Sequence, residues 1–480
     1  MTDDHPPSRP GDAAEPAFTP DEVVAVTGGR LLARSDRRIR GAAVDSRAVR
    51  PGEAFVALPG EHTDGHAFLD AAATAGAAAL IVTRPPADVA SLGDVSIVRV
   101  ADALAALQAL ATAWRSRFDP LVVGVTGSIA KTSTKEAVAA VLSHRFTTLR
   151  NEGNLNNEIG LPITVLRLGP EHRAAVLEMG MYVGGEIRDL AAIARPEIGV
   201  VTAVQAVHLS RIGTLEAIEQ AKGELVEALP DDGTAILNAD DERVRRMASR
   251  TRALSVTYGF ADDADVRGEG VESAGVDGMR FTLRTSAGRR SVSIPTLGRL
   301  SVHNALAGAA VGLAAGMSLD DVAAALAAGW SAPHRGQLVR LGEVTVVDDS
   351  YNASPGSVVA ALELLGGLPG RRIAVLGEML ELGDAHESGH RSVGEAAAGV
   401  AELLVVIGRG AAGIADGARA AGLDGGRVIE AADRDAALDA LRPRLRPGDV
   451  VLVKASRGVG LDVLVDRLAE ELGVAGTPAR

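Results

Sequence analysis

The stretch "GVTGSIAKTSTKE", residues Gly124–Glu136, holds the turn that decides the fold. It starts within the apolar run "LVVGV", which predicts a buried strand, and continues into "KTSTKEAVAAVLSHR", whose apolar spacing predicts a helix. A strand, a glycine turn and a Lys-Thr pair opening a helix are typical of phosphate-binding loops. Backbone N–H groups would hold phosphates, Lys131 would add positive charge, and Thr132 offers an Mg²⁺ ligand. Because Ala130 stands where such loops normally have glycine, an ordinary strand-to-helix turn is the alternative from these residues alone.

Composition sets the class of protein. A chain of 480 residues suggests roughly three domains of about 150 residues each. Hydrophobic residues make up 47%, enough for large cores, and the absence of cysteine excludes disulfides and thiol chemistry. The net charge of −13 argues against a nonspecific nucleic-acid binder. With no run of eighteen apolar residues and no signal peptide, we expect a soluble cytoplasmic protein without a membrane span.

The rhythm of strands and helices predicts three α/β domains after a disordered, proline-rich tail at residues 1–20. Residues 21–119 form a small N-terminal α/β domain. Residues 120–331 alternate strand and helix signals, which predicts a mostly parallel sheet, with an antiparallel insert over residues 266–294. Residues 332–480 repeat the alternation as a Rossmann-like domain.

The C-terminal domain carries a second glycine turn. Gly408, Gly410 and Gly413 follow the apolar run "LLVVI", and Glu430 comes about twenty residues later. This spacing matches the dinucleotide fingerprint of nicotinamide-dependent enzymes. Taken alone the match is weak, and a dehydrogenase is the last of the functions considered.

Lys222 is singled out by helical periodicity. In "TLEAIEQAKGELVEAL", the apolar residues Leu215, Ile218, Leu225 and Leu229 form one stripe, and Lys222 falls inside it. A lysine on the buried face of a helix is costly unless it is paired or modified. The alternative is a side chain whose aliphatic part is buried while its amine reaches water.

Several segments, taken together and in order, resemble the Mur ligase family. They are "GVTGSIAKTSTKE", "NEGNLNNEIGLPITVLRL", "VLEMGMYVGGEI", "KGEL", "HNALA" and "VDDSYNASPGSVVAALELL". The resemblance runs from about Val44 to Leu468. Within the family, "NLNNEIG" and "DDSYNASP" resemble the branch that adds a dipeptide, D-Ala-D-Ala.

The resemblance implies a reaction and its participants. ATP would phosphorylate the terminal carboxylate of UDP-N-acetylmuramoyl-tripeptide, and the amine of D-Ala-D-Ala would displace phosphate from the acyl phosphate. The implied cofactors are ATP and Mg²⁺, the implied pathway is peptidoglycan precursor synthesis, and we expect a monomer. A related ligase with another amine acceptor and a catalytically silent nucleotide-binding protein are the alternatives.

The resemblance also assigns roles to residues of this chain. Lys131, Glu178, His208 and Lys222 take the catalytic positions, and Lys222 matches the lysine that some Mur ligases carbamylate. The implied metal ligands are Thr132, Glu178 and His208. The implied ATP-binding residues are Gly127, Ser128, Ile129, Ala130, Lys131, Thr132, Ser133, Asn304, Arg335 and Asp349. The implied substrate-binding residues are Ser46, Arg47, Asn154, Asn156, Asn157, Tyr351, Asn352, Lys454 and Ser456.

Three positions depart from the family pattern. Gln205-Ala206 replaces a common Gly-Pro, and Ala455 replaces a glycine near Lys454. The family also usually has glycine at the position of Ala130, where a positive φ would cost alanine about 1 kcal/mol or somewhat more. Because the lysine, threonine, glutamate and histidine are all retained, we expect a functional site.

Overall fold

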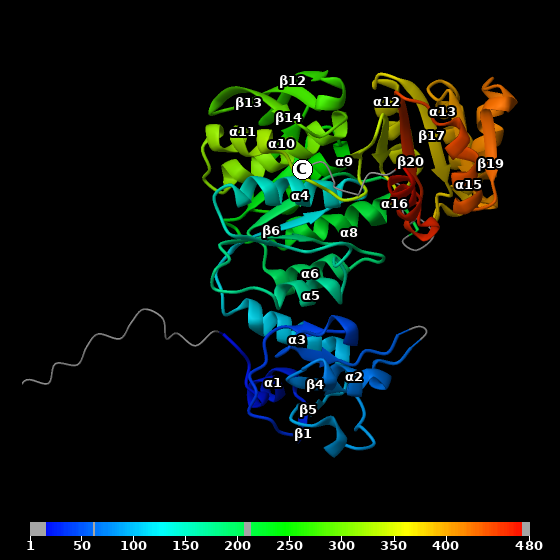
Figure 1. Ribbon diagram of the computed structural model, residues 1–480. Coiled ribbons are helices and arrows are strands. Elements are labelled where there is room, and N and C mark those ends of the chain that lie inside the picture. The colour runs from blue at the N-terminus through cyan, green and yellow to red at the C-terminus, as the bar shows by residue number, and fades with distance from the viewer. Residues whose placement is uncertain (1–15, 61–62, 206–212, 473–480) are drawn as a thin grey trace, which may run out of the picture. The chain divides into compact units, whose positions relative to one another are not determined.

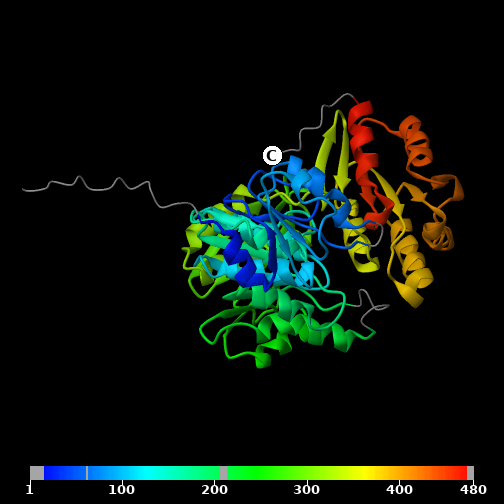
Figure 2. The ribbon, with the colours of Figure 1, turned by 90° about the horizontal axis from the view of Figure 1, so that it is seen from below.

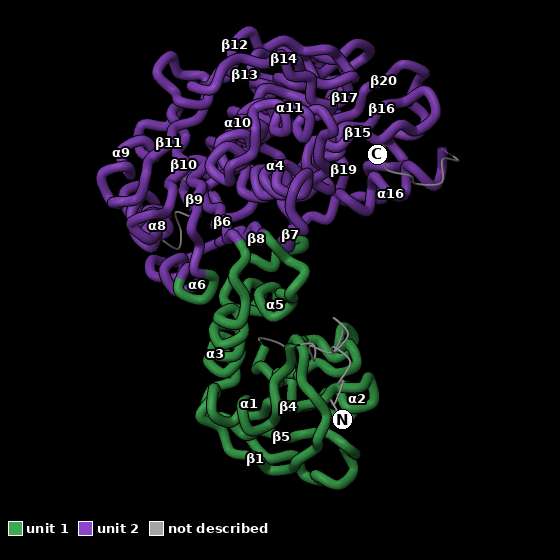
Figure 3. The backbone as a smooth tube through the Cα atoms, turned by 90° about the vertical axis from the view of Figure 1, so that its left-hand side faces the viewer, with its two compact units in different colours: residues 1–120, 151–173, 192–194 green, residues 121–150, 174–191, 195–480 purple. Residues whose placement is uncertain are grey.

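Across the residues that the structure describes, the chain forms three separate β-sheets (Figure 1). The structure is a computed structural model that describes residues 16–60, 63–205 and 213–472. Packing divides the chain into two compact units (Figure 3). The first comprises residues 1–120, 151–173 and 192–194, and the second comprises residues 121–150, 174–191 and 195–480. The five-stranded sheet belongs to the first unit, and the nine- and six-stranded sheets belong to the second.

The first unit is built on a sheet with the strand order β1-β5-β4-β3-β2, in which β1 pairs antiparallel to β5 and the other pairs are parallel. Its strands are β1 (Arg30–Ala33), β2 (Ala42–Ala43), β3 (Ala54–Val56), β4 (Ala79–Val82) and β5 (Ser96–Arg99). Its helices are α1 (Pro20–Thr27), α2 (Leu69–Thr74), α3 (Ala103–Arg115) and α5 (Gly160–Val165).

The folded part of the first unit starts earlier than the tail predicted over residues 1–20. Residues 1–15 lie outside the described part of the chain. Phe18 is buried, and its backbone exchanges two hydrogen bonds with Ile39 (2.8 and 3.0 Å). Thr19 caps α1, since its side chain accepts a hydrogen bond from the backbone of Glu22 (3.2 Å). A buried aromatic ring and a capping box therefore hold residues that the composition assigns to a tail.

The central sheet has the order β14-β13-β12-β11-β10-β9-β6-β8-β7. It is parallel from β7 to β12, and β13 and β14 add the predicted antiparallel hairpin to one edge. Its strands are β6 (Leu121–Thr126), β7 (Thr148–Arg150), β8 (Ala174–Glu178), β9 (Ile198–Val201), β10 (Thr234–Asn238), β11 (Leu254–Gly259), β12 (Val266–Ser273), β13 (Met279–Thr285) and β14 (Gly288–Ile294). Its helices are α4 (Lys131–Ser143), α6 (Glu186–Ala194), α8 (Leu215–Glu227), α9 (Glu242–Arg246), α10 (Arg299–Ala314) and α11 (Leu319–Ala328).

The C-terminal sheet has the order β15-β16-β20-β17-β18-β19, with only β15 antiparallel to its neighbour. Its strands are β15 (Gln337–Leu341), β16 (Val344–Asp348), β17 (Arg371–Gly377), β18 (Leu403–Ile407), β19 (Val428–Ala431) and β20 (Asp449–Lys454). Its helices are α12 (Pro355–Gly366), α13 (His386–Ala398), α14 (Ala412–Ala420), α15 (Arg434–Leu441) and α16 (Asp462–Glu471).

Helices cover both faces of the C-terminal sheet, as expected for parallel strands that are apolar throughout. One core joins α12, α13 and α14 to the sheet, and a second core joins α15 and α16 to its other face. Figure 2 shows α16 (red) beside the β15–β16 pair (yellow-green), in agreement with its contact to β16. The predicted Rossmann-like arrangement is confirmed.

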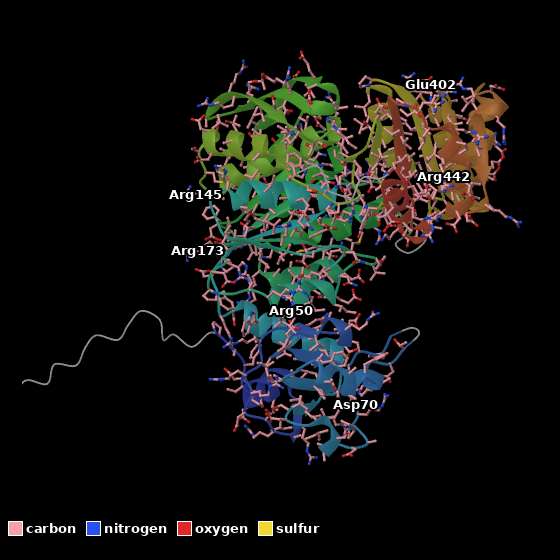
Figure 4. All side chains as sticks on the ribbon, viewed as in Figure 1. Arg50, Asp70, Arg145, Arg173, Glu402 and Arg442 are labelled. Atoms are coloured by element: carbon pink, nitrogen blue, oxygen red, sulfur yellow. The ribbon has the colours of Figure 1, made fainter. Side chains whose placement is uncertain are left out.

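Charged side chains lie at the periphery of this sheet. Figure 4 labels Glu402 and Arg442, which form exposed ion pairs with Arg372 (3.4 Å) and Glu471 (2.7 Å). Exposed pairs of this kind contribute little to stability.

None of the helices in the described residues has both the length and the apolar character of a membrane span.

Candidate functional site

The glycine turn joins the end of β6 to the start of α4, as predicted. Gly127 has φ +149°, and an added Cβ would lie 1.9 Å from the hydroxyl oxygen of Thr202, so only glycine fits there. Ala130 is the N-cap of α4 and adopts φ +62°, ψ 1°, the left-handed conformation. It has no side-chain atom that can cap the helix. Ala130 therefore does not cap the first backbone N–H groups of α4. A phosphate-binding turn requires such uncapped N–H groups, because they bind the phosphate.

The turn is fixed to the segment that follows β9. Ser128 donates its backbone N–H to the carbonyl of Ala203 (2.7 Å). Its hydroxyl donates to the carbonyl of Gln205 (3.0 Å) and accepts the N–H of the same residue (2.9 Å). Thr202 donates its hydroxyl to the carbonyl of Ile129 (2.6 Å). The turn is therefore preorganised by neighbours distant in sequence.

Lys131 lies across the turn. Its ammonium donates to the carbonyls of Gly127 (2.8 Å) and Ser128 (3.2 Å). Burial lowers the Lys131 pKa, the Glu178 carboxylate opposes that shift, and the nearby charge of Arg335 adds to it. The arrangement places a half-buried cation beside the helix N-terminus, where a phosphate would sit.

Lys222 belongs to the same charged cluster. It is 3% exposed on α8, which confirms that the stripe buries it. Burial lowers the Lys222 pKa well below its ordinary value, Lys131 lowers it further, and the negative charge of Glu178 acts against both. A buried lysine held toward its neutral form is a stronger nucleophile than an exposed one. The fold thus places Lys131, Glu178 and Lys222 within electrostatic reach of one another.

The oxygen donors next to Lys131 suit a hard cation such as Mg²⁺. Glu178 ends β8 with its carboxylate buried, and Thr132 lies in the first turn of α4. His208, the third predicted ligand, lies outside the described residues. Within the described ranges, no group of three His, Cys, Asp or Glu side chains is placed to hold a metal.

Asn304 contacts the start of α4, the helix that also carries Ser133. Asn304, on α10, is buried and accepts a hydrogen bond from the hydroxyl of Thr134 (2.9 Å). Ser133 is half-buried in the first turn of α4. Asn304 thereby anchors the start of α4, a structural role compatible with the implied position beside a base.

A buried glutamate next to Lys222 was missed from the sequence. Glu224 is 4% exposed and accepts the backbone N–H groups of Gly185 (2.7 Å) and Arg188 (3.1 Å) at the start of α6. It therefore ties α8 to the segment that leaves Glu178. A glutamate within an otherwise helical polar pattern gives no sign of burial, so only the packing of α6 against α8 reveals it.

Arg335 stacks on an aromatic ring, and the preceding residue, His334, pairs with a buried carboxylate. Its guanidinium lies 4.2 Å from the ring centroid of Tyr351, and Arg457 lies 5.3 Å from the same ring. His334, with φ +59°, pairs with buried Asp348 (2.7 Å). Tyr351 therefore contacts two cations, while Asp348 has a structural role.

Half-buried Asp349 and buried Lys454 form an ion pair at the carboxyl end of the C-terminal sheet. The Lys454 ammonium donates to the Asp349 carboxylate (2.6 Å) and to the carbonyl of Asn352 (2.9 Å). The side chain of Asn352 accepts the N–H of Ala353 (2.9 Å), and Ser456 accepts the N–H of Leu380 (2.9 Å). The structure brings these predicted residues to one edge, and Lys454 is engaged by protein groups there.

The predicted substrate-binding residues of the first unit lie in two loops. Ser46 is buried, whereas Arg47 is exposed and pairs with Asp45 (2.6 Å); this pairing lowers the Asp45 pKa to about 2. Asn157 accepts the N–H of Gly160 (2.9 Å) at the start of α5, a turn-forming role. Asn154 and Asn156 lie in the loop between β7 and α5.

The second glycine turn is filled by protein atoms. A Cβ at Gly410 would lie 2.1 Å from the Glu378 carboxyl carbon, and one at Gly413 would lie 3.1 Å from His390. Glu430, the expected ribose ligand, pairs with Arg419 (2.6 Å). Packing against Glu378 thus explains Gly410, and close packing of α14 against α13 explains Gly413.

The family of the chain follows from comparison with known proteins. It matches the profiles named Mur ligase family, catalytic domain (residues 38–115), Mur ligase middle domain (residues 125–312) and Mur ligase, glutamate ligase domain (residues 334–457). A relative from Mycobacterium tuberculosis H37Rv, named UDP-N-acetylmuramoyl-tripeptide–D-alanyl-D-alanine ligase, is 39% identical, with 95% of this chain and 98% of the relative covered. The chain belongs to the Mur ligase family.

Solved Mur ligase structures share its architecture. A crystal structure of MurF from Acinetobacter baumannii has a TM-score of 0.85 at 29% identity, covering 95% of this chain and 99% of that one. The MurF ligase from Thermotoga maritima in complex with ADP has a TM-score of 0.79 at 29% identity, covering 90% and 98%. The three-domain α/β fold predicted for this Mur ligase is confirmed.

Proposed function

We propose that this Mur ligase joins D-Ala-D-Ala to UDP-N-acetylmuramoyl-tripeptide, using ATP and Mg²⁺, in cytoplasmic peptidoglycan precursor synthesis. The observation that carries the proposal is the cluster of Lys131, Glu178 and Lys222 near the N-terminus of α4, in which Lys131 lies across the turn and Glu178 and Lys222 are buried. The full-length likeness to a relative named for this reaction supports the choice of substrates.

The reaction has two chemical steps. A carboxylate oxygen of the tripeptide attacks the γ-phosphorus of ATP, the bond to the bridging oxygen breaks, and ADP leaves with that oxygen. The amine of D-Ala-D-Ala then attacks the acyl carbon, a C–N bond forms, and the C–O bond to phosphate breaks. Inorganic phosphate leaves, and the amine loses its proton to solvent or to a protein base.

The residues of this chain would act mainly by position and charge. Lys131 and the N–H groups of α4 would bind the phosphates, and Arg335 would add positive charge. Thr132, Glu178 and His208 would hold Mg²⁺, which supplies charge neutralisation between two anions. A carbamylated Lys222 would replace a cation with a carboxylate that faces the same metal.

The remaining assignments follow the family pattern. Asn304 and Asp349 would contact the nucleoside, while Tyr351, Asn352, Lys454 and Ser456 would line the substrate side of the C-terminal sheet. Ser46 and Arg47 would bind the uridine diphosphate, and the loop with Asn154, Asn156 and Asn157 would contact the tripeptide. The proposed domains are residues 21–119, 120–331 and 332–480, and the proposed state is a monomer.

The test is phosphate release by the purified protein with Mg-ATP and UDP-N-acetylmuramoyl-tripeptide, with and without D-Ala-D-Ala. Release that depends on the dipeptide, with the pentapeptide confirmed by mass, supports the proposal. Release that depends on another amine identifies a different acceptor. Nucleotide binding without phosphate release with any amine acceptor identifies a catalytically silent nucleotide-binding protein. Ala130 in the phosphate-binding turn is the reason for considering this alternative.

A further inference from the structure

Thr202 lies directly beneath the phosphate-binding turn. It follows the last residue of β9, is 3% exposed, and donates its backbone N–H to the carbonyl of Thr126 (2.9 Å). Its hydroxyl donates to the carbonyl of Ile129 (2.6 Å). That carbonyl belongs to the peptide bond that leads into Ala130, the residue with φ +62°. The hydroxyl therefore holds the peptide that begins the left-handed turn.

The fit between the turn and Thr202 is close on a second side. Gly127 has no side chain, and the Thr202 hydroxyl occupies the space where a Cβ would be, 1.9 Å away. The hydroxyl is thus packed against one end of the turn and hydrogen-bonded near the other. A single side-chain group therefore contacts both ends of the turn.

The backbone of Thr202 is itself fixed by a second layer of polar groups. The side-chain amide of Asn238, at the end of β10, donates to the Thr202 carbonyl (2.7 Å). The Asn238 oxygen lies 3.0 Å from Nε2 of His303, and the same imidazole lies 3.3 Å from the Asp240 carboxylate. This layer keeps the Thr202 hydroxyl from moving away from the turn.

We call the hydrogen bond from the Thr202 hydroxyl to the Ile129 carbonyl the clamp. The turn needs it because residue 130 is alanine. A left-handed φ is unfavourable for a residue with a Cβ, whereas glycine adopts it readily. With alanine at this position, the turn would relax toward negative φ and rotate the N–H groups at the start of α4 unless something opposed it. The Thr202–Ile129 hydrogen bond opposes that rotation.

We propose that Thr202 is a positioning residue whose hydroxyl holds the Ala130 turn in its phosphate-binding shape and thereby compensates for the missing glycine. The proposal rests on the proposed function only in that the turn binds the phosphates of ATP. It predicts a specific dependence: the hydroxyl matters greatly with alanine at position 130 and little with glycine there.

The experiment measures the dissociation constant of a non-hydrolysable Mg-ATP analogue by calorimetry. Thr202→Val removes the hydroxyl at constant shape, and Thr202→Ser keeps it. We expect Thr202→Val to weaken binding about tenfold, the size of one lost hydrogen bond, and Thr202→Ser to stay within about threefold of the parent. In an Ala130→Gly background, Thr202→Val should weaken binding by less than about threefold.

Thr164→Val is the matched control. Thr164 is 1% exposed and its hydroxyl donates to the carbonyl of Gly160 (3.0 Å), so the variant also removes a buried hydroxyl that binds a backbone carbonyl, but away from the turn. It should leave the dissociation constant unchanged. Thermal unfolding of every variant separates loss of binding from loss of folding. If Thr202→Val alone does not fold, recovery of folding and binding by added Ala130→Gly supports the clamp, and failure to recover overturns it.

Two further results overturn the proposal. One is a folded Thr202→Val protein that binds the analogue as tightly as the parent. The other is an equal loss of affinity whether Thr202→Val is made in the parent or in the Ala130→Gly background. Both are distinct from a failure of the proposed function, since analogue binding requires no amine acceptor, and a parent protein that binds the analogue yet releases no phosphate leaves the clamp test intact.

Discussion

Two turns in this molecule have the same local design and opposite surroundings. Each follows a buried parallel strand, begins with a glycine and leads into a helix: Gly127–Ala130 before α4, and Gly408–Ala411 before α14. At the first turn a half-buried lysine lies across the backbone. At the second, the Glu378 carboxylate packs against Gly410. Glycine spacing therefore predicts the shape of a turn, and the charge beside it decides whether a phosphate can bind.

The difference has a simple physical cause. Gly413 allows α14 to pack closely against α13, whereas Gly127 makes room for the Thr202 hydroxyl. An anionic side chain near a helix N-terminus competes with a phosphate for the same dipole. At the C-terminal turn the chain itself supplies such an anion, Glu378, whose carboxylate lies against Gly410 and pairs with His386 (3.1 Å).

The largest expected effect is on kcat/KM, and it compares removal of a cation from each of the two turns. Lys131→Ala should lower kcat/KM for dipeptide-dependent phosphate release by about 10²- to 10³-fold, because it removes the positive charge at the phosphates. Arg409→Ala, an exposed cation in the C-terminal turn, is the matched control and should leave kcat/KM within about twofold. Equal losses in both variants would contradict the assignment of the nucleotide to the first turn.

Gly410→Ala tests the C-terminal turn through stability and ATP affinity. The new methyl group would meet the Glu378 carboxylate, so we expect the free energy of unfolding to fall by about 1–3 kcal/mol with the affinity for ATP unchanged. Adding Glu378→Ala should restore much of the lost stability, which urea unfolding of the single and double variants can measure. Weaker ATP binding in the folded Gly410→Ala protein would show that the second turn takes part in the nucleotide site.

Lys222, which is buried on α8 within electrostatic reach of Lys131, predicts a dependence of stability on pH. Because folding lowers the Lys222 pKa, the unfolded chain binds this proton more readily, and stability rises as pH increases toward the ordinary lysine value of 10.5. Lys222→Met should therefore be more stable than the parent at pH 7, with the difference shrinking by pH 10. Denaturant unfolding in bicarbonate-free buffer tests this, and a difference that does not change with pH would mean that folding does not lower the Lys222 pKa.

The smallest effect concerns Ala130. Ala130→Gly removes the strain of a left-handed alanine but adds freedom to the unfolded chain, so the free energy of unfolding should change by about 1 kcal/mol or less. Thermal unfolding measures the change. A large destabilisation would mean that the Ala130 methyl group has a packing role that outweighs its strained backbone.

Much of this architecture could be predicted because it is encoded locally. Alternation of apolar runs and helical patterns predicts the three sheets, and the helical stripe that includes Lys222 predicts its burial. Ala130 shows the limit, since a sequence gives the residue but not its φ. Thr202 and Glu224 were missed because their partners, Ile129 and the start of α6, are 73 and 36–39 residues away in sequence.

The assignment of residues to the first unit shows a similar limit. Residues 151–173 pack with the N-terminal sheet, although they follow the phosphate-binding helix in sequence. The side chain of Trp114 donates to the carbonyl of Leu168 (2.9 Å), a long-range contact that no local pattern announces. The predicted boundary at residue 120 describes the chain order of the sheets but not this exchange.

The most direct test of the central claim is hydrogen exchange of backbone amides, measured by mass spectrometry with and without a non-hydrolysable Mg-ATP analogue. We expect slower exchange in peptides that span residues 124–136 and no change in peptides that span residues 407–414. Protection of residues 407–414 without protection of residues 124–136 would contradict this expectation.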